Sequence, residues 1–312
     1  MKDFFPYAYF DGQVVRIEDA KISVTTHALQ YGTGCFGGIR GYLSSDGQSI
    51  RLFRLKDHFN RFHRSAQLLK IKVPLDTAEL IDLTCELVNK NAVSTDVYFR
   101  PYAYKAGMQL GPNLDKVADG FTMYSLPMGN YFKKEHGLAL MVSSWTRPED
   151  NAIPARAKVS GAYVNSSLAK DDAEAHGFDD AIMLNSRGKV SEASAANLFM
   201  VREGQLITTP TTSDILEGIT RKTLMELAAD LGIPFVEREI DRTELYICDE
   251  VFLCGTGVQL TPVTSIDRRN VGSGQVGEIT GRLLKQFRAI IRGDISDFDH
   301  WITSVPAAVK VS

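Results

Sequence analysis

A lysine set among small residues is the first group in this sequence that could do covalent chemistry. Lys158 lies within Ile153–Tyr163, where alanine, serine and glycine are its neighbours. A lysine amine can attack a carbonyl when a ligand can approach closely and the surroundings lower its pKa from about 10.4. Most lysines are solvated surface charges. The stretch therefore suggests carbonyl chemistry without establishing it.

Three other stretches carry groups that such chemistry could use. Glu192, in VSEASAANLF, is either a counter-charge or an exposed turn carboxylate. Gly218-Ile219-Thr220 opens a predicted helix, whose free N–H groups and dipole would bind an anion. Gly255-Thr256-Gly257 follows an apolar strand, so it is either an anion nest or an ordinary turn.

Two arginines could supply full positive charge. The first, Arg61, lies in a helix predicted over Asp57–Lys70 with Asp57 as N-cap, and periodicity alone places it on a solvated face. The apolar stripe of that helix is Phe59, Phe62, Ala66 and Leu69. The second, Arg100, shares one face of a predicted strand with Tyr98 because the side-chain period of a strand is two. An inward-facing arginine would need a carboxylate partner.

The order of these pieces resembles the class IV aminotransferases that use pyridoxal 5'-phosphate, most closely the branched-chain amino acid aminotransferases. The strings that carry the resemblance, with the lysine stretch, are HALQYGTGCFGGIR, DHFNRF, YFRPY, VSEASAANLF, LEGITRKTL and CGTGVQLTPV. They cover the chain from about Tyr7 to about Phe287. The resemblance implies an α/β fold of type IV, with a small N-terminal α/β domain and a larger domain that has a β-barrel-like sheet and flanking helices. The polar segment 127–137 is the predicted boundary, between a small domain at 1–126 and a cofactor-binding domain at 138–312.

The resemblance also implies catalytic roles. Lys158 would be the Schiff-base lysine and would carry the proton between the substrate and the cofactor. Glu192 would keep the pyridine nitrogen protonated, and Tyr163 would donate a hydrogen bond to the phenolate oxygen and help to keep the pKa of the lysine low. A core tyrosine is the alternative for Tyr163. The implied cofactor contacts are Arg61, Lys158, Tyr163, Glu192, Gly218, Ile219, Thr220 and Thr256.

The substrate implied by the resemblance is a branched-chain L-amino acid, Leu, Ile or Val, with 2-oxoglutarate as the acceptor, as in branched-chain amino acid biosynthesis. The matching pocket positions are Tyr31, Phe36, Gly38, Tyr98, Arg100, Tyr131, Thr256, Gly257 and Leu110, the last of which could come from a neighbouring subunit. Gly37 and Met128 depart from the family pattern, where glutamate and tryptophan are common. An (R)-amine or D-amino acid transaminase, or an aminodeoxychorismate-type lyase, therefore stays as an alternative.

Turn signals and periodicity predict the elements around these groups. Alternating apolar residues on either side of Asp11-Gly12 predict a hairpin over Tyr7–Arg16. Helices are expected over 77–91, 166–176, 219–231 and 277–291, and strands over 39–43, 97–104, 121–126, 138–144, 181–184, 197–201, 206–208 and 251–254. The match of Gly32, Gly34 and Gly37 to a dinucleotide fingerprint is rejected, because a strand rather than a helix follows it.

Composition limits the class of protein. The 312 residues suffice for about two domains, and 44% hydrophobic with 23% charged residues is typical of a globular chain. A net charge of −3 argues against nucleic acid and for small-molecule partners, here amino acids and 2-oxo acids. We expect a cytoplasmic protein without signal peptide or membrane span, without a metal, and forming a homodimer or higher homo-oligomer. A nonenzymatic binding protein is disfavoured, since every catalytic position is filled.

Overall fold

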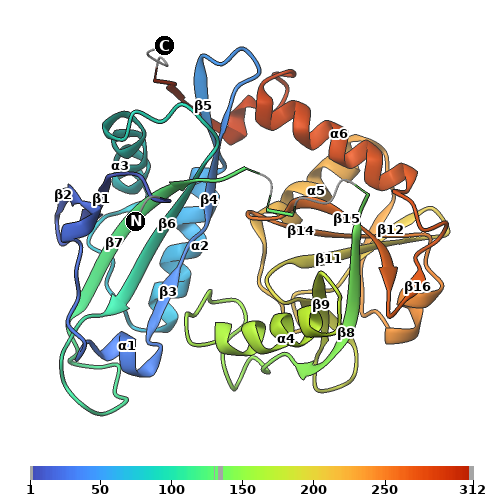
Figure 1. The fold of residues 1–312 in the computed structure, drawn as a ribbon, viewed down its shortest axis with the longest axis horizontal. Helices are drawn as coiled ribbons and strands as arrows, with labels where there is room; N and C mark the ends of the chain where they lie inside the picture. The colour runs from blue at the N-terminus through green and yellow to red at the C-terminus, as the bar shows by residue number, and fades with distance from the viewer. Residues whose placement is uncertain (1–2, 130, 133–135, 309–312) are drawn as a thin grey trace. The chain divides into compact units, whose positions relative to one another are not determined.

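The chain folds into two compact units (Figure 1). The structure is a computed structural model that describes residues 3–129, 131–132 and 136–308. The first unit takes its described residues from Met1–Gly129, Ala157–Gly161 and Ala289–Ser312, and the second from Asn130–Arg156 and Ala162–Arg288. The domain limits expected from the sequence stay a prediction. The contacts nevertheless place the short segment around Lys158 with the first unit.

The first unit is built on a largely antiparallel sheet with the order β17-β5-β4-β6-β7-β1-β2, and β3 pairs with β6. Its strands in chain order are β1 (Tyr7–Phe10), β2 (Gln13–Arg16), β3 (Gly34–Phe36), β4 (Ile39–Leu43), β5 (Ser49–Phe53), β6 (Val97–Lys105), β7 (Asp119–Pro127) and β17 (Ile302–Pro306). The predicted hairpin is confirmed as β1 and β2. Asp11 and Gly12 both have positive φ there, as a tight primed turn requires.

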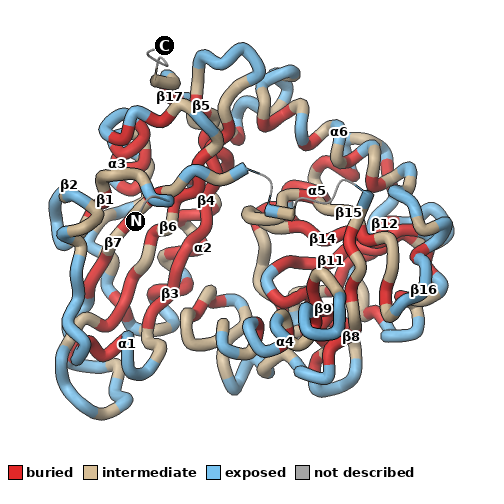
Figure 2. Tube along the Cα trace, viewed as in Figure 1, coloured by how far each residue is buried: buried red, intermediate tan, exposed pale blue. Residues whose placement is uncertain are grey.

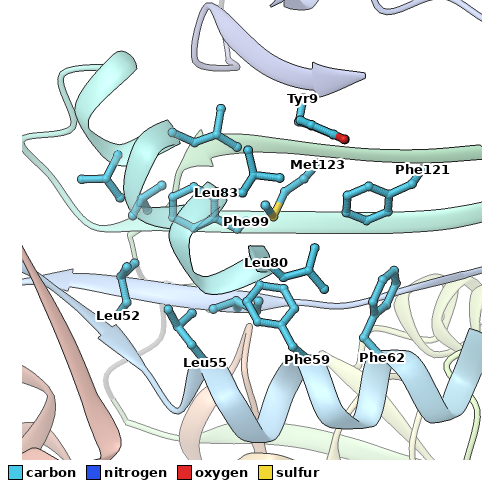
Figure 3. Packing of buried hydrophobic residues seen from close by; sticks show 14 of the residues in the cluster. Tyr9, Leu52, Leu55, Phe59, Phe62, Leu80, Leu83, Phe99, Phe121 and Met123 are labelled. Carbon is cyan, nitrogen blue, oxygen red and sulfur yellow. The ribbon is translucent and has the colours of Figure 1, made fainter. Parts of the chain in front are cut away.

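Two helices, α2 (Leu55–Leu68) and α3 (Thr77–Lys90), enclose the core of this unit. Figure 3 shows Phe59 and Phe62 of α2 close to Leu80 of α3 and to Phe99 and Phe121 of the sheet. The expectation that Asp57 caps α2 was wrong. The N-cap is Arg54, and Asp57 lies in the first turn, where its Oδ2 is 2.6 Å from Arg54 Nε.

The second unit has a mixed sheet with the order β10-β9-β8-β15-β14-β11-β12-β13, and β16 pairs with β15. Its strands are β8 (Leu138–Thr146), β9 (Asp180–Leu184), β10 (Val190–Ala193), β11 (Asn197–Arg202), β12 (Gln205–Thr208), β13 (Phe235–Glu237), β14 (Glu250–Gly255), β15 (Gln259–Ile266) and β16 (Arg269–Asn270). Figure 2 shows how completely β11 and β14 are buried.

Helices flank this second sheet. The small residues Ala169 and Ala173 of α4 (Tyr163–Ala175) pack against Ala181 and Met183 of β9. The other helices are α5 (Ile219–Asp230) and α6 (Glu278–Arg292), of which α6 belongs to this unit as far as Arg288, and a short 3₁₀ turn spans Arg242–Tyr246. The 3₁₀ turns Ile17–Asp19 and Asp299–Trp301 belong to the first unit. Gly232 follows α5 with φ of 66°, as predicted for a helix end. Within the described residues, no helix is long and apolar enough to cross a membrane.

Glu244 carries the clearest pH-dependent contribution to the stability of this unit. Arg238 donates to both of its oxygens at 2.9 and 2.7 Å, and Arg202 adds a bond of 3.1 Å. These bonds, those from Arg238 first, lower the pKa of Glu244 to about 2. The ionised form therefore stabilises the fold above the ordinary carboxyl pKa, and this contribution is lost as the pH falls toward 2.

Replacing Glu244 by glutamine is expected to lower Tm at pH 7, because three charge-assisted hydrogen bonds lose their negative partner. Thermal unfolding of wild type and variant at several pH values would measure the difference. We expect the gap in Tm to narrow below about pH 4. A gap that stays constant from pH 7 to pH 3 would contradict the assigned role of the Glu244 charge.

Candidate active site

Lys158 is held against β3 by its own backbone. Phe36 N donates to Lys158 O at 3.1 Å, and Ser160 N donates to Gly34 O at 2.8 Å. Close packing reinforces these bonds, since a Cβ added to Gly32 would come within 2.7 Å of the Cα of Gly161. The segment Ala157–Gly161 thus lies beside β3 almost as an extra edge strand, which fixes where the lysine side chain starts.

The side chain of Lys158 shares an aromatic neighbour with Arg100. Lys158 Nζ is 5.2 Å from the centroid of the Phe36 ring, and Arg100 Cζ is 4.3 Å from it. Both are cation–π distances. Arg100 also donates to Tyr98 Oη from Nη2, at 3.0 Å. The strand-period prediction for Tyr98 and Arg100 is confirmed, and the structure brings Phe36, Tyr98, Arg100 and Lys158 together.

Gly38 leaves room for the Tyr98 ring. A Cβ built on Gly38 would be 2.3 Å from Tyr98 Oη and 3.0 Å from Cζ, far inside van der Waals contact. A Cβ on Gly37 would be 2.7 Å from Pro101 Cγ. Both glycines are buried, so neither neighbour has open solvent to move into. The glutamate that is common in the family at Gly37 would not fit here without a shift of Pro101.

Gly38→Ala is therefore expected to move Tyr98 and, through the bond between Oη and Nη2, the Arg100 guanidinium. If this cluster is the substrate pocket that the resemblance implies, the KM for the substrate should rise about tenfold, roughly 1.4 kcal/mol of lost binding, with a smaller change in kcat. Steady-state kinetics would measure it. Gly281→Ala is the control, because a Cβ added to Gly281 would meet no atom within 4 Å and Gly281 lies within the helix α6. An unchanged KM in Gly38→Ala would show that Tyr98 does not contact substrate.

Arg61 is buried, at 6% exposed, so it does not lie on the solvated face that periodicity alone would give it, and the cofactor role implied by the resemblance stays a prediction. It lies one turn after His58, which is 4% exposed and whose Nδ1 has no hydrogen-bond partner among the residues described. Burial, followed by the charges of Arg61, Arg54 and Lys158, lowers the pKa of His58 well below its usual value. The imidazole is neutral at pH 7, and the positive charge around it favours an anion.

Tyr31 and the loop that follows β6 are joined. Tyr31 ends α1 (His27–Tyr31), and its Oη accepts from Gly111 N at 3.0 Å. The buried His27 ring reaches the same glycine, with Nε2 2.9 Å from Gly111 O. Leu110 is next to this anchor and is 82% exposed. The structure thus fixes the loop that carries Leu110 onto α1.

In the second unit, Glu192 lies on β10 with its carboxylate buried and with a polar partner on each oxygen. Arg147 Nη2 is 2.7 Å from Oε1, and Asn197 Nδ2 donates to Oε2 at 2.8 Å. Leu216 N reaches both oxygens at 3.3 Å. Only 4% of Glu192 is exposed. The arginine and the amide donors offset the cost of burying this charge, which argues against an exposed turn carboxylate.

The amino end of α5 is tied to the same carboxylate. Asn197 also donates to Leu216 O at 2.9 Å, and a Cβ on Gly218 would be 2.0 Å from Asn197 Oδ1. Gly218 is the N-cap without a side-chain cap, and the first turn carries no acid. Ile219 and Thr220 are buried there. The free N–H groups and the helix dipole make this end suited to an anion, as predicted.

The other residues of the second unit that the sequence predicted for the site lie on separate elements. Tyr163 is the first residue of α4 and is half-buried. Thr256 and Gly257 form the turn after β14 that leads back into β15. Tyr131 is 52% exposed and packs edge-on against Phe132.

Three supporting residues were missed from the sequence: Ser65, Arg147 and Asn197. Asn197 stands inside VSEASAANLF and could have been found as a polar residue at the start of an apolar strand. A buried glutamate needs a nearby cation, so a partner for Glu192 could be expected. No local sequence pattern identifies Arg147 as that partner. Ser65 is one of many serines, and no pattern distinguishes it.

The family assignment follows from comparison with known proteins. The family model for class IV aminotransferases matches residues 34–266, which include both clusters. The chain belongs to the class IV aminotransferases. A probable branched-chain-amino-acid aminotransferase of Synechocystis is 42% identical over 307 residues, covering 98% of this chain and 99% of that protein.

Solved structures of class IV aminotransferases agree with this one over nearly their whole length. The branched-chain aminotransferase of Thermoproteus uzoniensis, solved with norvaline, is 40% identical with a TM-score of 0.91, covering 96% of this chain and 98% of that one. The enzyme of Thermobaculum terrenum in its PLP form is 36% identical with a TM-score of 0.92, covering 97% and 99%. The α/β fold of type IV expected from the sequence is confirmed.

Proposed function

We propose that this chain is a branched-chain amino acid aminotransferase that exchanges the amino group between leucine, isoleucine or valine and 2-oxoglutarate with pyridoxal 5'-phosphate. The observation that carries the proposal is 42% identity, over 98% of the chain, to a protein named as a probable enzyme of this kind. The Thermobaculum terrenum enzyme, solved in its PLP form, supports the cofactor. Membership of the class IV family supports the reaction type.

Each unit alone offers groups that fit part of this cofactor. The first has an amine at Lys158 and a buried guanidinium at Arg61. The second has a buried carboxylate at Glu192 and an uncapped helix start at Gly218. When bound, pyridoxal 5'-phosphate supplies a carbonyl carbon for amines and a ring that accepts electrons. An amine, a carboxylate and two anion-binding groups are the set it needs.

We assign the residues as follows. The Lys158 amine would hold the cofactor at its carbonyl carbon with loss of water, and once the substrate amine has displaced it, its Nζ would move a proton to and from the substrate Cα. The Glu192 carboxylate would accept a hydrogen bond from the pyridine nitrogen and keep the proton there, and Tyr163 Oη would donate to the phenolic oxygen. Contacts to the phosphate come from the arginine, backbone N–H groups and hydroxyls of Arg61, Gly218, Ile219, Thr220 and Thr256.

The cluster around Phe36 suits both substrates. The ring offers an apolar surface to a branched side chain, and the Arg100 guanidinium beside it offers two parallel N–H donors to the γ-carboxylate of glutamate. Tyr98 holds Arg100 in place through the bond at 3.0 Å. The other proposed substrate contacts are Tyr31, Gly38, Leu110, Tyr131, Thr256 and Gly257.

Titration of the purified holoenzyme tests this function. L-leucine should bleach the visible absorbance of the bound cofactor, and 2-oxoglutarate should restore it. Initial rates with L-leucine, D-alanine and (R)-1-phenylethylamine would then rank the donors. Cofactor absorbance that D-alanine or the R-amine bleaches and L-leucine leaves unchanged would replace the proposed substrate with one of the alternatives. A protein that cannot be reconstituted with the cofactor would overturn the function itself.

We also propose that the enzyme is a homodimer or higher homo-oligomer. Support comes from large apolar side chains of the first unit that are open to solvent in the single chain, Val24 and Leu110 at 82% each and Met108 at 68%. Covering these side chains with a second copy of the chain would remove their apolar surface from water. Light scattering after size-exclusion chromatography would give the mass, and a monomer at micromolar concentration would contradict it. The cytoplasmic location stays a prediction.

A further inference from the structure

Ser65 links the backbones of Lys158 and Arg61, two residues that we propose to bind the cofactor. It lies in α2, one turn after Arg61, and is 1% exposed. Its Oγ donates to Arg61 O at 3.0 Å and accepts from Lys158 N at 3.3 Å. One hydroxyl therefore joins the carbonyl of the arginine to the amide of the lysine.

We propose that Ser65 is a positioning residue for transamination. Through its two hydrogen bonds it fixes the position of the Lys158 backbone relative to the Arg61 backbone within the first unit. The inference rests on the proposed function, since it takes Lys158 as the reacting amine. Ser65 touches neither substrate nor cofactor in this proposal. It acts through the two backbones that it connects.

The two sides of the Lys158 backbone are held by different elements. Phe36 N, on β3, donates to the carbonyl of Lys158. Ser65, on α2, accepts from its N–H. Without the second contact, the segment would keep its backbone bonds to β3 but would lose its bond to α2. With both contacts in place, the direction of the Lys158 side chain is fixed relative to α2, the helix that carries Arg61.

Only a hydroxyl of this size can fill the role. Serine has one donor and two acceptor positions, so it can donate to one backbone and accept from another at once. Alanine removes the Oγ atom, and with it both bonds and the volume that this atom fills. Cysteine has nearly the same shape, but its thiol is a weak donor and acceptor. The two substitutions therefore separate loss of hydrogen bonding from loss of packing.

Thr84 provides the matched control. Its Oγ1 donates to Leu80 O at 2.7 Å, the same bond to the preceding turn, within the buried face of α3 in the same unit. The second contact of Thr84 is the sulfur of Met123 at 3.9 Å, in the apolar core. Thr84→Ala thus removes a buried back-bonded hydroxyl that has no connection to Lys158.

The experiment compares wild type, Ser65→Ala, Ser65→Cys and Thr84→Ala. We measure Tm, the Kd of the apoprotein for pyridoxal 5'-phosphate, and the rate of the first half-reaction at saturating L-leucine. Both Ser65 variants should slow the half-reaction about tenfold, because misplacing a reacting group by about 1 Å can cost up to 10²-fold. Both should also raise the Kd for the cofactor about fivefold, with half-saturation by L-leucine within about twofold of wild type.

Thr84→Ala should have a lower Tm than wild type, with a half-reaction rate and a cofactor Kd within about twofold of the wild-type values. Wild-type rate and Kd in Ser65→Cys would overturn the proposal, and so would equal losses in Thr84→Ala. If Ser65→Ala does not fold, Ser65→Cys decides the question alone. Failure of the proposed function is distinguishable, because the wild type itself would then show no half-reaction with L-leucine, whereas the cofactor Kd would still report on Ser65.

Discussion

Lys158→Ala is expected to reduce transamination by about 10³-fold or more, since one amine both bonds to the cofactor and transfers the proton, and a positioned acid–base group alone contributes about 10²–10⁴. The visible absorbance that depends on the lysine should also be lost. The fold should persist, because the backbone bonds of the segment to β3, through Phe36 N and Gly34 O, do not involve the side chain. The half-reaction with L-leucine and circular dichroism would measure both effects.

Lys105 offers a matched control for the loss of a partly or fully buried lysine. It is 2% exposed, and its Nζ is 2.8 Å from Asp119 Oδ1 in the same unit. Breaking this buried pair in Lys105→Met should lower Tm by several degrees, about 3 kcal/mol of stability. Its kcat should stay within about twofold of wild type below its unfolding transition. Retention of more than a tenth of the activity in Lys158→Ala would remove the lysine from its assigned role.

Local pattern was enough to predict most elements that carry the site. Alternation and turn residues predicted the β1–β2 hairpin and β4, and the paired position of Tyr98 and Arg100 on β6 followed from the strand period alone. These signals work because they depend on neighbours in the chain. The same holds for the amino end of α5, where Gly218 precedes the apolar helix.

Long-range pairing could not be predicted in this way. β17 completes the first sheet by pairing with β5, about 250 positions earlier, and nothing near Ile302–Pro306 specifies that partner. Periodicity alone could not predict the burial of Arg61 for a related reason. It identifies the main apolar stripe of α2, whereas residues beside that stripe are covered by segments far away in sequence, such as the backbone of Lys158 over Ser65. Arg147 beside Glu192 is a third case.

Glu192→Gln is expected to slow the first half-reaction by about 10²-fold or more. Glutamine keeps the shape and can still accept a hydrogen bond, but it carries no negative charge to hold a proton on the pyridine nitrogen. The substitution also leaves Arg147 opposite a neutral group, where a bond of 2.7 Å now joins two charges. Breaking a buried pair from one side costs about 3–5 kcal/mol, so Tm should fall as well.

The double variant Arg147→Met/Glu192→Gln separates these two effects. Because the double variant has no buried arginine charge opposite a neutral glutamine, its Tm should be higher than that of Glu192→Gln. Its half-reaction should stay slow. Glu244→Gln is the control for losing an arginine-bound carboxylate elsewhere in the same unit, and it should lower Tm at pH 7 with kcat nearly unchanged. If the double variant regained the rate along with the stability, Glu192 would act by holding the fold together. A rate that stays low at restored Tm assigns its charge to the chemistry, since the packing around Asn197 and Leu216 is then intact.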